Sequence, residues 1–308
     1  MKHADRPLFA IAMRIVATLL FATMLMLVKV AGEAGVAAPE IMFWRQAVTL
    51  PMLLGWLLFR RSLRRLRTRR MASHATRAIL GMTAMGLNFF AAIHLPLAEA
   101  TTLSFTAPVF AVILTALVLH ERVGPWRWSA VVLGFVGVLI IAQPGGAPIS
   151  MLGTAAGLAG GFMLSIVSFQ IRGLAQTEDA LACVFYFAVF GALFTSVFLP
   201  VAMTPHTLEI WLVLLAMGAV GTLGQFFATL SLRHGAVATV IIMDYISLLW
   251  AALYGWLIWD RLPLLATWLG APAIIAAGLV IGWREHRLAR ARVPAAALQD
   301  ASPAIKEQ

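Results

Sequence analysis

The sequence predicts an all-α integral membrane protein with ten transmembrane helices, arranged as two inverted repeats of five helices. Hydrophobic residues make up 61% of the 308 residues and charged residues only 12%, which is more apolar material than one soluble core can enclose. Apolar stretches of about 20 residues, the length that crosses a hydrocarbon layer, recur along most of the chain. Short motifs of the first half also reappear, in the same order, in the second half.

The apolar stretches end at charged residues, prolines or glycines, and cutting the chain at these breaks gives ten segments. They cover about residues 8–30, 41–59, 78–95, 97–119, 126–143, 152–172, 181–200, 208–231, 236–258 and 264–283. Helices satisfy their own backbone hydrogen bonds in lipid, whereas these runs are too long and lack the alternation of barrel strands. The first segment has no small-residue cleavage site leading into a polar domain, so we interpret it as a retained helix.

The 23 Lys and Arg residues predict how the helices are oriented. Nearly all of them lie at the amino terminus, in the connectors that follow even-numbered segments, and in the tail, whereas Arg261 is alone in a connector of the other side. By the positive-inside rule, the chain spans a bacterial inner membrane with both termini in the cytoplasm. The densest basic group is the second connector, with Arg60, Arg61, Arg64, Arg65, Arg67, Arg69, Arg70 and Arg77.

The formal net charge of +10 raises the alternative of a nucleic-acid-binding protein. The basic residues flank helices instead of forming a separate domain, so contact with anionic lipid headgroups explains them and no nucleic-acid partner is expected. The one cysteine, Cys183, lies in an apolar run, which excludes a disulfide framework or a cysteine metal cluster. No metal and no cofactor are therefore expected.

An internal repeat divides the chain into units at residues 8–143 and 152–284, followed by a cytoplasmic tail, 285–308, that is expected to be disordered. The matched motifs are Asn88-Phe89-Phe90-Ala91 with Gln225-Phe226-Phe227-Ala228, and Ala98-x-Ala100-Thr101 with Ala236-x-Ala238-Thr239. Because each unit has an odd number of helices, the second must be inverted relative to the first. Inverted repeats are typical of secondary transporters, which bind substrate near the membrane midplane between the repeats.

A further set of residues follows one order in both halves. The first half has Lys29, Trp44-Arg45 and a stretch from Ala98 and Thr102 through Pro108-Val109-Phe110 to Glu121-Arg122; the second has Ala236, Asp260-Arg261, Gly270 and Gly278. In this order the residues resemble the EamA family of the drug/metabolite transporter superfamily. The resemblance implies a ten-helix carrier with a central cavity that moves amino acids, their derivatives, vitamins or related metabolites, often outward. Ile246, where Pro108 would repeat, departs from the pattern.

The motif search gives no catalytic signature, whether phosphate loop, zinc helix or nucleophile elbow, so an enzyme is not expected. The favoured function is a secondary transporter, an exporter of a small organic metabolite, that is driven by a proton, cation or substrate gradient without ATP hydrolysis. An uptake carrier for a vitamin or nucleoside-like metabolite is one alternative. A membrane enzyme acting on a lipid-linked substrate and a scaffold are others, and a homodimer stays open as the assembled state.

The residues expected to bind a substrate or an ion are unusual polar or aromatic residues within apolar segments. They are Asp244, Arg45, Asn88, Gln225, Trp44, Trp250, Ser247 and Tyr254. A carboxylate about 12 Å into segment nine costs at least about 2.5 kcal/mol, so Asp244 must be protonated, paired or facing a wet cavity. Ser247 lies one turn away and could share its site. The alternative for Asp244 is a fixed ion pair with Arg45 or Arg14, or a neutral, hydrogen-bonded acid.

The other candidates also have two interpretations each. Arg45 either pairs with Glu40 or binds a substrate carboxylate, and the amides of Asn88 and Gln225 either join helices or line a cavity. The aromatic candidates could form flat walls for a ring or a cation. Arg14 and Lys29 lie near opposite ends of segment one, so both can extend to a membrane interface.

Overall fold

The structure is a computed structural model that describes residues 7–118, 120, 123–142, 150–175, 177–234 and 242–301. Within these ranges the chain is helical and has no strand. Eight helical stretches among the described residues are long and apolar enough to cross a membrane, one of them running from Leu97 to Leu117 through two consecutive helices, and a shorter apolar helix spans Ala180–Ser196. The expectation of an all-α membrane protein is therefore confirmed, whereas the count of ten spans in two repeats stays a prediction.

Most helices follow the expected segments, but the last helix continues to Ala301 and so takes in much of the tail, residues 285–308, that is expected to be disordered. The first half contains α1 (Pro7–Glu33), α2 (Ala38–Phe59), α3 (Met71–His94), α4 (Leu97–Ser104), α5 (Ala107–Leu117) and α6 (Pro125–Ala142). The second contains α7 (Met151–Ala175), α8 (Ala180–Ser196), α9 (Leu199–Ala202), α10 (Leu208–His234), α12 (Ser247–Trp259) and α13 (Leu265–Ala301). Two short 3₁₀ helices, η1 (Leu63–Leu66) and η2 (Met243–Ile246), complete the set.

Segment four is interrupted where its proline requires it. The helix breaks between α4 and α5 at Phe105 and Thr106, and Pro108 occupies the first turn of α5, where its missing N–H is tolerated. The expected repeat of this region begins with the 3₁₀ helix η2, which ends at Ile246. Ala236, Ala238 and Thr239, the repeated motif that precedes η2, lie outside the described residues.

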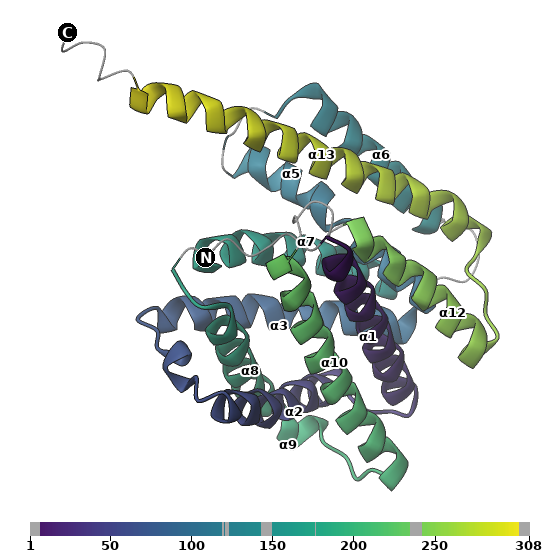
Figure 1. Ribbon diagram of the computed structural model, residues 1–308. Helices are drawn as coiled ribbons and strands as arrows, with labels where there is room; N and C mark the ends of the chain where they lie inside the picture. The colour runs from purple at the N-terminus through teal and green to yellow at the C-terminus, as the bar shows by residue number, and fades with distance from the viewer. Residues whose placement is uncertain are drawn as a thin grey trace.

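Several helix contacts occur in matching pairs that relate the two halves, although the contact of α1 with α3 is not matched by one of similar extent between α7 and α10. α1 packs along α10, and α3 along α7; α2 packs on α10, and α3 on α8; α1 also packs on α12, and α7 on α4. The counterparts in the two halves are α1 with α7, α2 with α8, α3 with α10, α4 with α12, and α6 with α13. When each helix is replaced by its counterpart, the first contact of each pair becomes the second. The same replacement leaves three contacts unchanged, namely α2 with α8, α4 with α12, and α6 with α13. In Figure 1, α6 and α13 lie side by side with α5 along one side of the molecule.

Glycines let several of these helix pairs approach closely. A Cβ atom at Gly157 of α7 would lie 2.9 Å from a methyl carbon of Leu103, and one at Gly137 of α6 would lie 2.7 Å from the carbonyl oxygen of Gly270 in α13. Along α7 the contacts run from Gly153 against Leu95 to Gly160 against Asn88, so α3 and α7 are antiparallel. Small residues at such contacts are typical of helix packing in membranes.

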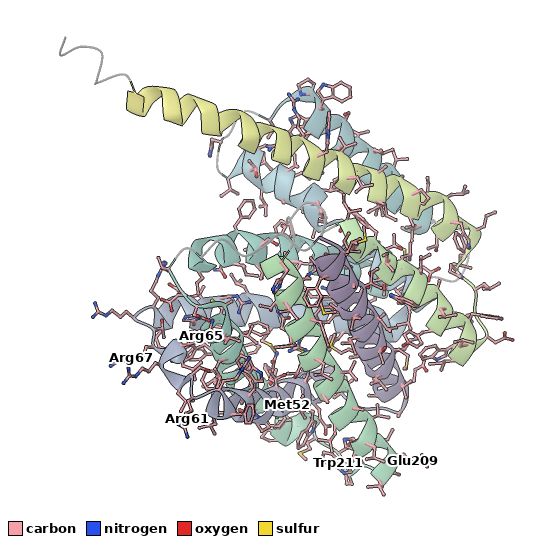
Figure 2. All side chains as sticks on the ribbon, viewed as in Figure 1. Met52, Arg61, Arg65, Arg67, Glu209 and Trp211 are labelled. Atoms are coloured by element: carbon pink, nitrogen blue, oxygen red, sulfur yellow. The ribbon has the colours of Figure 1, made fainter. Side chains whose placement is uncertain are left out.

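Charged and apolar side chains occupy different parts of the surface. Exposed apolar side chains such as Leu139, Leu212 and Leu257 are each about 60% accessible, as expected of surfaces that face lipid. Figure 2 shows Arg61, Arg65 and Arg67 gathered at the connector between α2 and α3, apart from Glu209 and Trp211 at the start of α10. The basic connector and the start of α10 therefore lie at different ends of the bundle.

Candidate functional site

Asp244 forms a bidentate ion pair with Arg14. The Nε and Nη2 atoms of Arg14 donate to the two carboxylate oxygens at 2.5 and 2.6 Å, and the side chains of Arg14 and Asp244 are 13% and 35% exposed. Arg14 lies two turns into α1 and Asp244 lies in η2. Instead of extending to the interface, Arg14 therefore pairs with the carboxylate that segment nine carries, through two parallel charge-assisted hydrogen bonds.

The hydroxyl groups of the two candidates Ser247 and Tyr254 in α12 are already engaged. The hydroxyl of Ser247 donates to the backbone oxygen of Asp244 at 2.6 Å, so it does not contact the carboxylate itself. The hydroxyls of Tyr254 and Thr23 share a hydrogen bond of 2.6 Å. Tyr254 thus joins α12 to the middle of α1.

Arg45 is a buried guanidinium that has no carboxylate partner among the described residues. The pair with Glu40, one of its two alternatives, is not formed in the structure; Glu40 instead accepts a hydrogen bond of 2.8 Å from Nε2 of His206. Arg45 is 7% exposed; its Nη1 donates to the amide oxygen of Gln46 at 3.1 Å, while its Nε has no partner there. Burying an unpaired charge is expensive, so a substrate carboxylate remains the interpretation of Arg45 that accounts for its charge.

The remaining candidates lie on separate helices. The Asn88 amide donates to the carbonyl of Ala84 in its own helix at 2.8 Å and faces Gly160 of α7. Gln225 makes no side-chain hydrogen bond to another described residue, and its amide is partly exposed. Trp44 and Trp250 each have a buried indole N–H without a partner in the described part of the chain.

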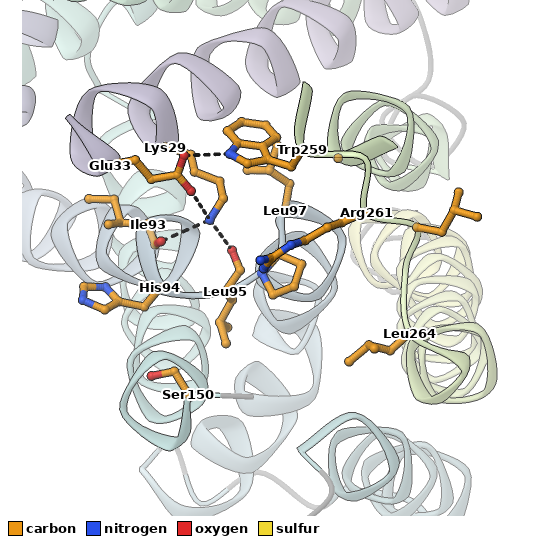
Figure 3. A pocket seen from close by; sticks show the side chains of 13 residues that line it. Lys29, Glu33, Ile93, His94, Leu95, Leu97, Ser150, Trp259, Arg261 and Leu264 are labelled. Atoms are coloured by element: carbon orange, nitrogen blue, oxygen red, sulfur yellow. Dashed lines mark hydrogen bonds and ion pairs between the residues drawn. The ribbon is translucent and has the colours of Figure 1, made fainter. Parts of the chain in front are cut away.

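The structure has a cavity of about 460 Å³ at the opposite end of α1 from Arg14. Its walls come from the end of α1, the turn between α3 and α4, and the connection between α12 and α13. Figure 3 shows Lys29, Glu33, Trp259 and Arg261 around this space. We call it the terminal cavity.

Lys29 caps the carboxyl-terminal end of α3 inside this cavity. Its Nζ donates to the carbonyl oxygens of Ala92, Ile93 and Leu95 at 3.2, 3.1 and 2.9 Å and lies 3.4 Å from a carboxylate oxygen of Glu33. The last carbonyls of a helix lack intrahelical partners and carry partial negative charge. A lysine that is 8% exposed is tolerated here because those carbonyls and Glu33 satisfy its donors.

Two further contacts complete the terminal cavity. The indole N–H of Trp259 donates to Glu33 at 2.6 Å, and the ring of Trp259 lies 5.6 Å from Nζ of Lys29. The carboxylate of Glu99, behind the wall, accepts from the backbone N–H of Leu264 at 3.2 Å and from the hydroxyl of Thr267 at 2.6 Å. Sequence reasoning missed this site, although a lysine four residues before a glutamate at a helix end was its one local signal.

Within the described residues, no group of three or more His, Cys, Asp or Glu side chains is placed so that it could hold a metal ion. Two histidines instead pair with one acid each. His74 contacts Glu178 at 3.3 Å. His206 and Glu40 form the other pair.

Comparisons with known proteins identify a family of transporters. The model of the EamA-like transporter family matches residues 8–143 and 151–283. The pseudopaline exporter CntI of Pseudomonas aeruginosa is 30% identical over 275 residues, which cover 88% of this chain and 95% of that protein. The riboflavin transporter of Brucella anthropi is 28% identical over 255 residues, 81% of this chain and 89% of that one. One crystal structure matches in fold alone, with a TM-score of 0.60 at 19% identity over 89% of this chain and 97% of the other.

Proposed function

The chain belongs to the EamA-like transporter family, and we propose that it is a secondary transporter of a small organic metabolite that works by alternating access without hydrolysing ATP. The family and the relatives named as transporters point to a transporter rather than an enzyme. The chain is a multi-pass membrane protein. The bacterial inner membrane, with both termini in the cytoplasm, is the location that its charge distribution supports.

The observation that carries this proposal is the different state of the two ends of α1. At one end, the ion pair of Arg14 with Asp244 fastens α1 to η2. At the other end lies the terminal cavity of about 460 Å³. A carrier must close its path on one side of the membrane while the path is accessible from the other. In the proposed positive-inside orientation, the end with the ion pair would be the closed cytoplasmic end. The end with the terminal cavity would be the accessible outer end.

Ten spans in two inverted repeats are part of the proposal. The exchange of helix contacts between the halves supports it, and so does the antiparallel packing of α3 on α7. Odd-numbered and even-numbered spans must run in opposite directions, and α3 and α7 would be the third and sixth. The repeats are proposed at residues 8–143 and 152–284.

The proposed substrate is an amino acid or an amino-acid-like or vitamin-like derivative, and the proposed direction is export. The relative named as the pseudopaline exporter supports export of a metabolite. The relative named as a riboflavin transporter supports the second candidate, a carrier for a vitamin-like metabolite that works in the direction of uptake. The sign of net movement in intact cells separates the two candidates.

The proposed binding groups have distinct roles. Arg45 would bind a substrate carboxylate because its buried charge has no acid partner among the described side chains. Asp244 would bind a substrate ammonium or a coupling proton after releasing Arg14. Trp44 and Trp250 would provide flat walls, and their free indole N–H groups would add hydrogen-bond donors. Asn88, Gln225, Ser247 and Tyr254 complete the proposed lining.

Metabolite profiling of cells tests the function. Cells that express the chain are compared with cells that express an equal membrane amount of the Asp244→Asn variant. The proposal expects a small set of metabolites to shift between cells and medium only with the unsubstituted chain. A metabolite found in this way should then enter liposomes that contain the purified chain and no nucleotide. Strict dependence on added nucleotide would refute a secondary transporter, and altered lipid-linked intermediates in the same extracts would favour the enzyme alternative.

A further inference from the structure

We propose that the terminal cavity is an anion subsite, separate from Arg45 and Asp244, in which Arg261 binds the carboxylate of a solute on the outer side of the membrane. The inference rests on the transport function proposed above for the presence of that solute. Its evidence is independent, because it comes from the charges and free donors of the cavity alone.

The size and walls of the terminal cavity suit a small organic anion. Its volume of about 460 Å³ falls within the range of small-molecule sites. The side chains of Leu95, Leu97 and Leu264 supply apolar wall surface. Since every wall segment is a helix end or a connector, the cavity opens at an end of the bundle, where water is the neighbour.

Two cationic groups converge on this space. Figure 3 shows the side chain of Arg261 extending across the cavity towards Lys29, and the two charges repel each other. Glu33 is the acid that lines the cavity with them. Its two oxygens already contact Lys29 and Trp259. Glu99 is committed to Leu264 and Thr267. A bound anion would therefore replace repulsion by attraction.

Arg261 carries the free donors of the cavity. Its guanidinium makes no hydrogen bond or ion pair with any side chain that the structure describes, whereas the donors of Lys29 are used by three carbonyl oxygens. A guanidinium offers five N–H donors in a planar fork that matches the two oxygens of a carboxylate. The backbone of Arg261 is held by a hydrogen bond of 3.1 Å to the carbonyl of Gly255, which fixes where the side chain starts.

The occupant is a solute and not a lipid headgroup because of the neighbouring groups. Each oxygen of Glu33 keeps a further lone pair beside its present contact, so Glu33 and the ring of Trp259, which lie beside the cationic pair, are placed to receive the ammonium group of an amino-acid-like solute. An anionic phospholipid has no such cation when its headgroup is phosphatidylglycerol.

Arginine modification tests the subsite on the whole chain. The purified protein in phosphatidylcholine nanodiscs is treated with phenylglyoxal, and the modification of each arginine is followed by mass spectrometry. The probes are phenylacetate and phenylacetamide, which share a shape and differ in charge. Phenylacetate should slow the modification of Arg261 by at least about threefold, phenylacetamide should not, and exposed Arg60 should react at an unchanged rate with both.

Binding of radiolabelled phenylacetate gives the second measurement. The Arg261→Gln variant should lose this binding, and the matched Arg60→Gln variant should keep it. Equal effects of both probes, or unchanged binding to Arg261→Gln, would overturn the subsite. Protection of Arg261 by phosphatidylglycerol nanodiscs alone would assign the site to a headgroup and also overturn the proposal. A chain that moves its metabolite yet fails these tests would leave the transport function standing.

Discussion

Asp244 and Arg14, which are separated by most of the chain, share two hydrogen bonds of 2.5 and 2.6 Å and thereby join η2 to α1. The carboxylate of segment nine is therefore compensated without being sealed, since its side chain is 35% exposed. This arrangement suits a bond that is made and broken during a transport cycle.

Replacing Asp244 by asparagine should leave the amount of protein in the membrane unchanged and abolish transport, or make it insensitive to the proton gradient. The change keeps the shape of the side chain and removes the charge that holds Arg14. Transport rates on both sides of neutral pH measure the effect. The charge-reversed double variant Arg14→Asp with Asp244→Arg is the control, and it should keep the membrane abundance of the unsubstituted chain without its proton sensitivity. Wild-type rates for Asp244→Asn at every pH would make the ion pair structural.

Reporter fusions should place Arg67 and the carboxyl terminus in the cytoplasm and the region of His206 outside. The expectation follows from the basic connector between α2 and α3 and from the even number of spans. Paired alkaline phosphatase and fluorescent-protein fusions measure it, because each is active on one side only. An outside signal from the carboxyl terminus would contradict ten spans and the inverted repeat together.

Lys29→Met should lower the free energy of unfolding by about 1–3 kcal/mol, because it leaves carbonyl oxygens at the end of α3 without a donor. Thermal unfolding in detergent measures the change as a lower midpoint. Lys29→Arg retains a cation and should unfold close to the unsubstituted chain. Equal midpoints for Lys29→Met and Lys29→Arg would show that the contacts to Ala92, Ile93 and Leu95 do not stabilise the fold.

Gly137→Val should separate α6 from α13 and lower stability by about 1–3 kcal/mol, since overpacking forces the backbone to move. Even one Cβ atom there would lie 2.7 Å from the Gly270 carbonyl oxygen. Gly55→Val in α2 is the matched control, because a Cβ atom at Gly55 meets nothing within 4 Å. Unfolding midpoints that fall equally for both variants would attribute the loss to helix propensity and not to the contact.

Arg45→Met should raise stability while abolishing transport of a carboxylate-bearing metabolite. The substitution removes a buried charge that has no acid partner among the described residues, and apolar replacements of such groups are often stabilising. Arg77→Met is the comparison. Arg77 donates to the carbonyl of Cys183 at 3.0 Å and its guanidinium lies 4.9 Å from the ring of Phe187, so its loss should destabilise. Destabilisation by Arg45→Met with transport intact would assign Arg45 to the fold.

Helix positions could be predicted because they depend on local properties. Apolar length, glycine and proline breaks and charged connectors are all readable along the chain, and Pro108 marks the interruption between α4 and α5. Side-chain partners depend on packing between distant helices. The sequence therefore left Arg14 and Arg45 as equal partners for Asp244, and the structure selects Arg14.

The choice between the two alternatives for Arg45, a pair with Glu40 or a substrate carboxylate, stayed open in the sequence for the same reason. The partner that Glu40 has, His206, lies in the connector before α10, and a single histidine in a connector has no periodic pattern. The role of Lys29 was likewise hidden, because its acceptors are backbone carbonyls of another helix. Residue type says nothing about the position of those carbonyls.

The hydrogen bond of Thr23 with Tyr254 lies between the two end contacts of α1, which are Arg14 with Asp244 and Glu33 with Trp259. At 1.5 Å per residue, Thr23 is about 14 Å from Arg14 and about 15 Å from Glu33 along the helix. The central hydrogen bond thus divides the length between the two end contacts of α1 into nearly equal parts. If α1 tilts as a stiff helix about that point, its two ends move by similar distances in opposite directions. Breaking both end contacts at the same time is then less favourable than breaking one of them.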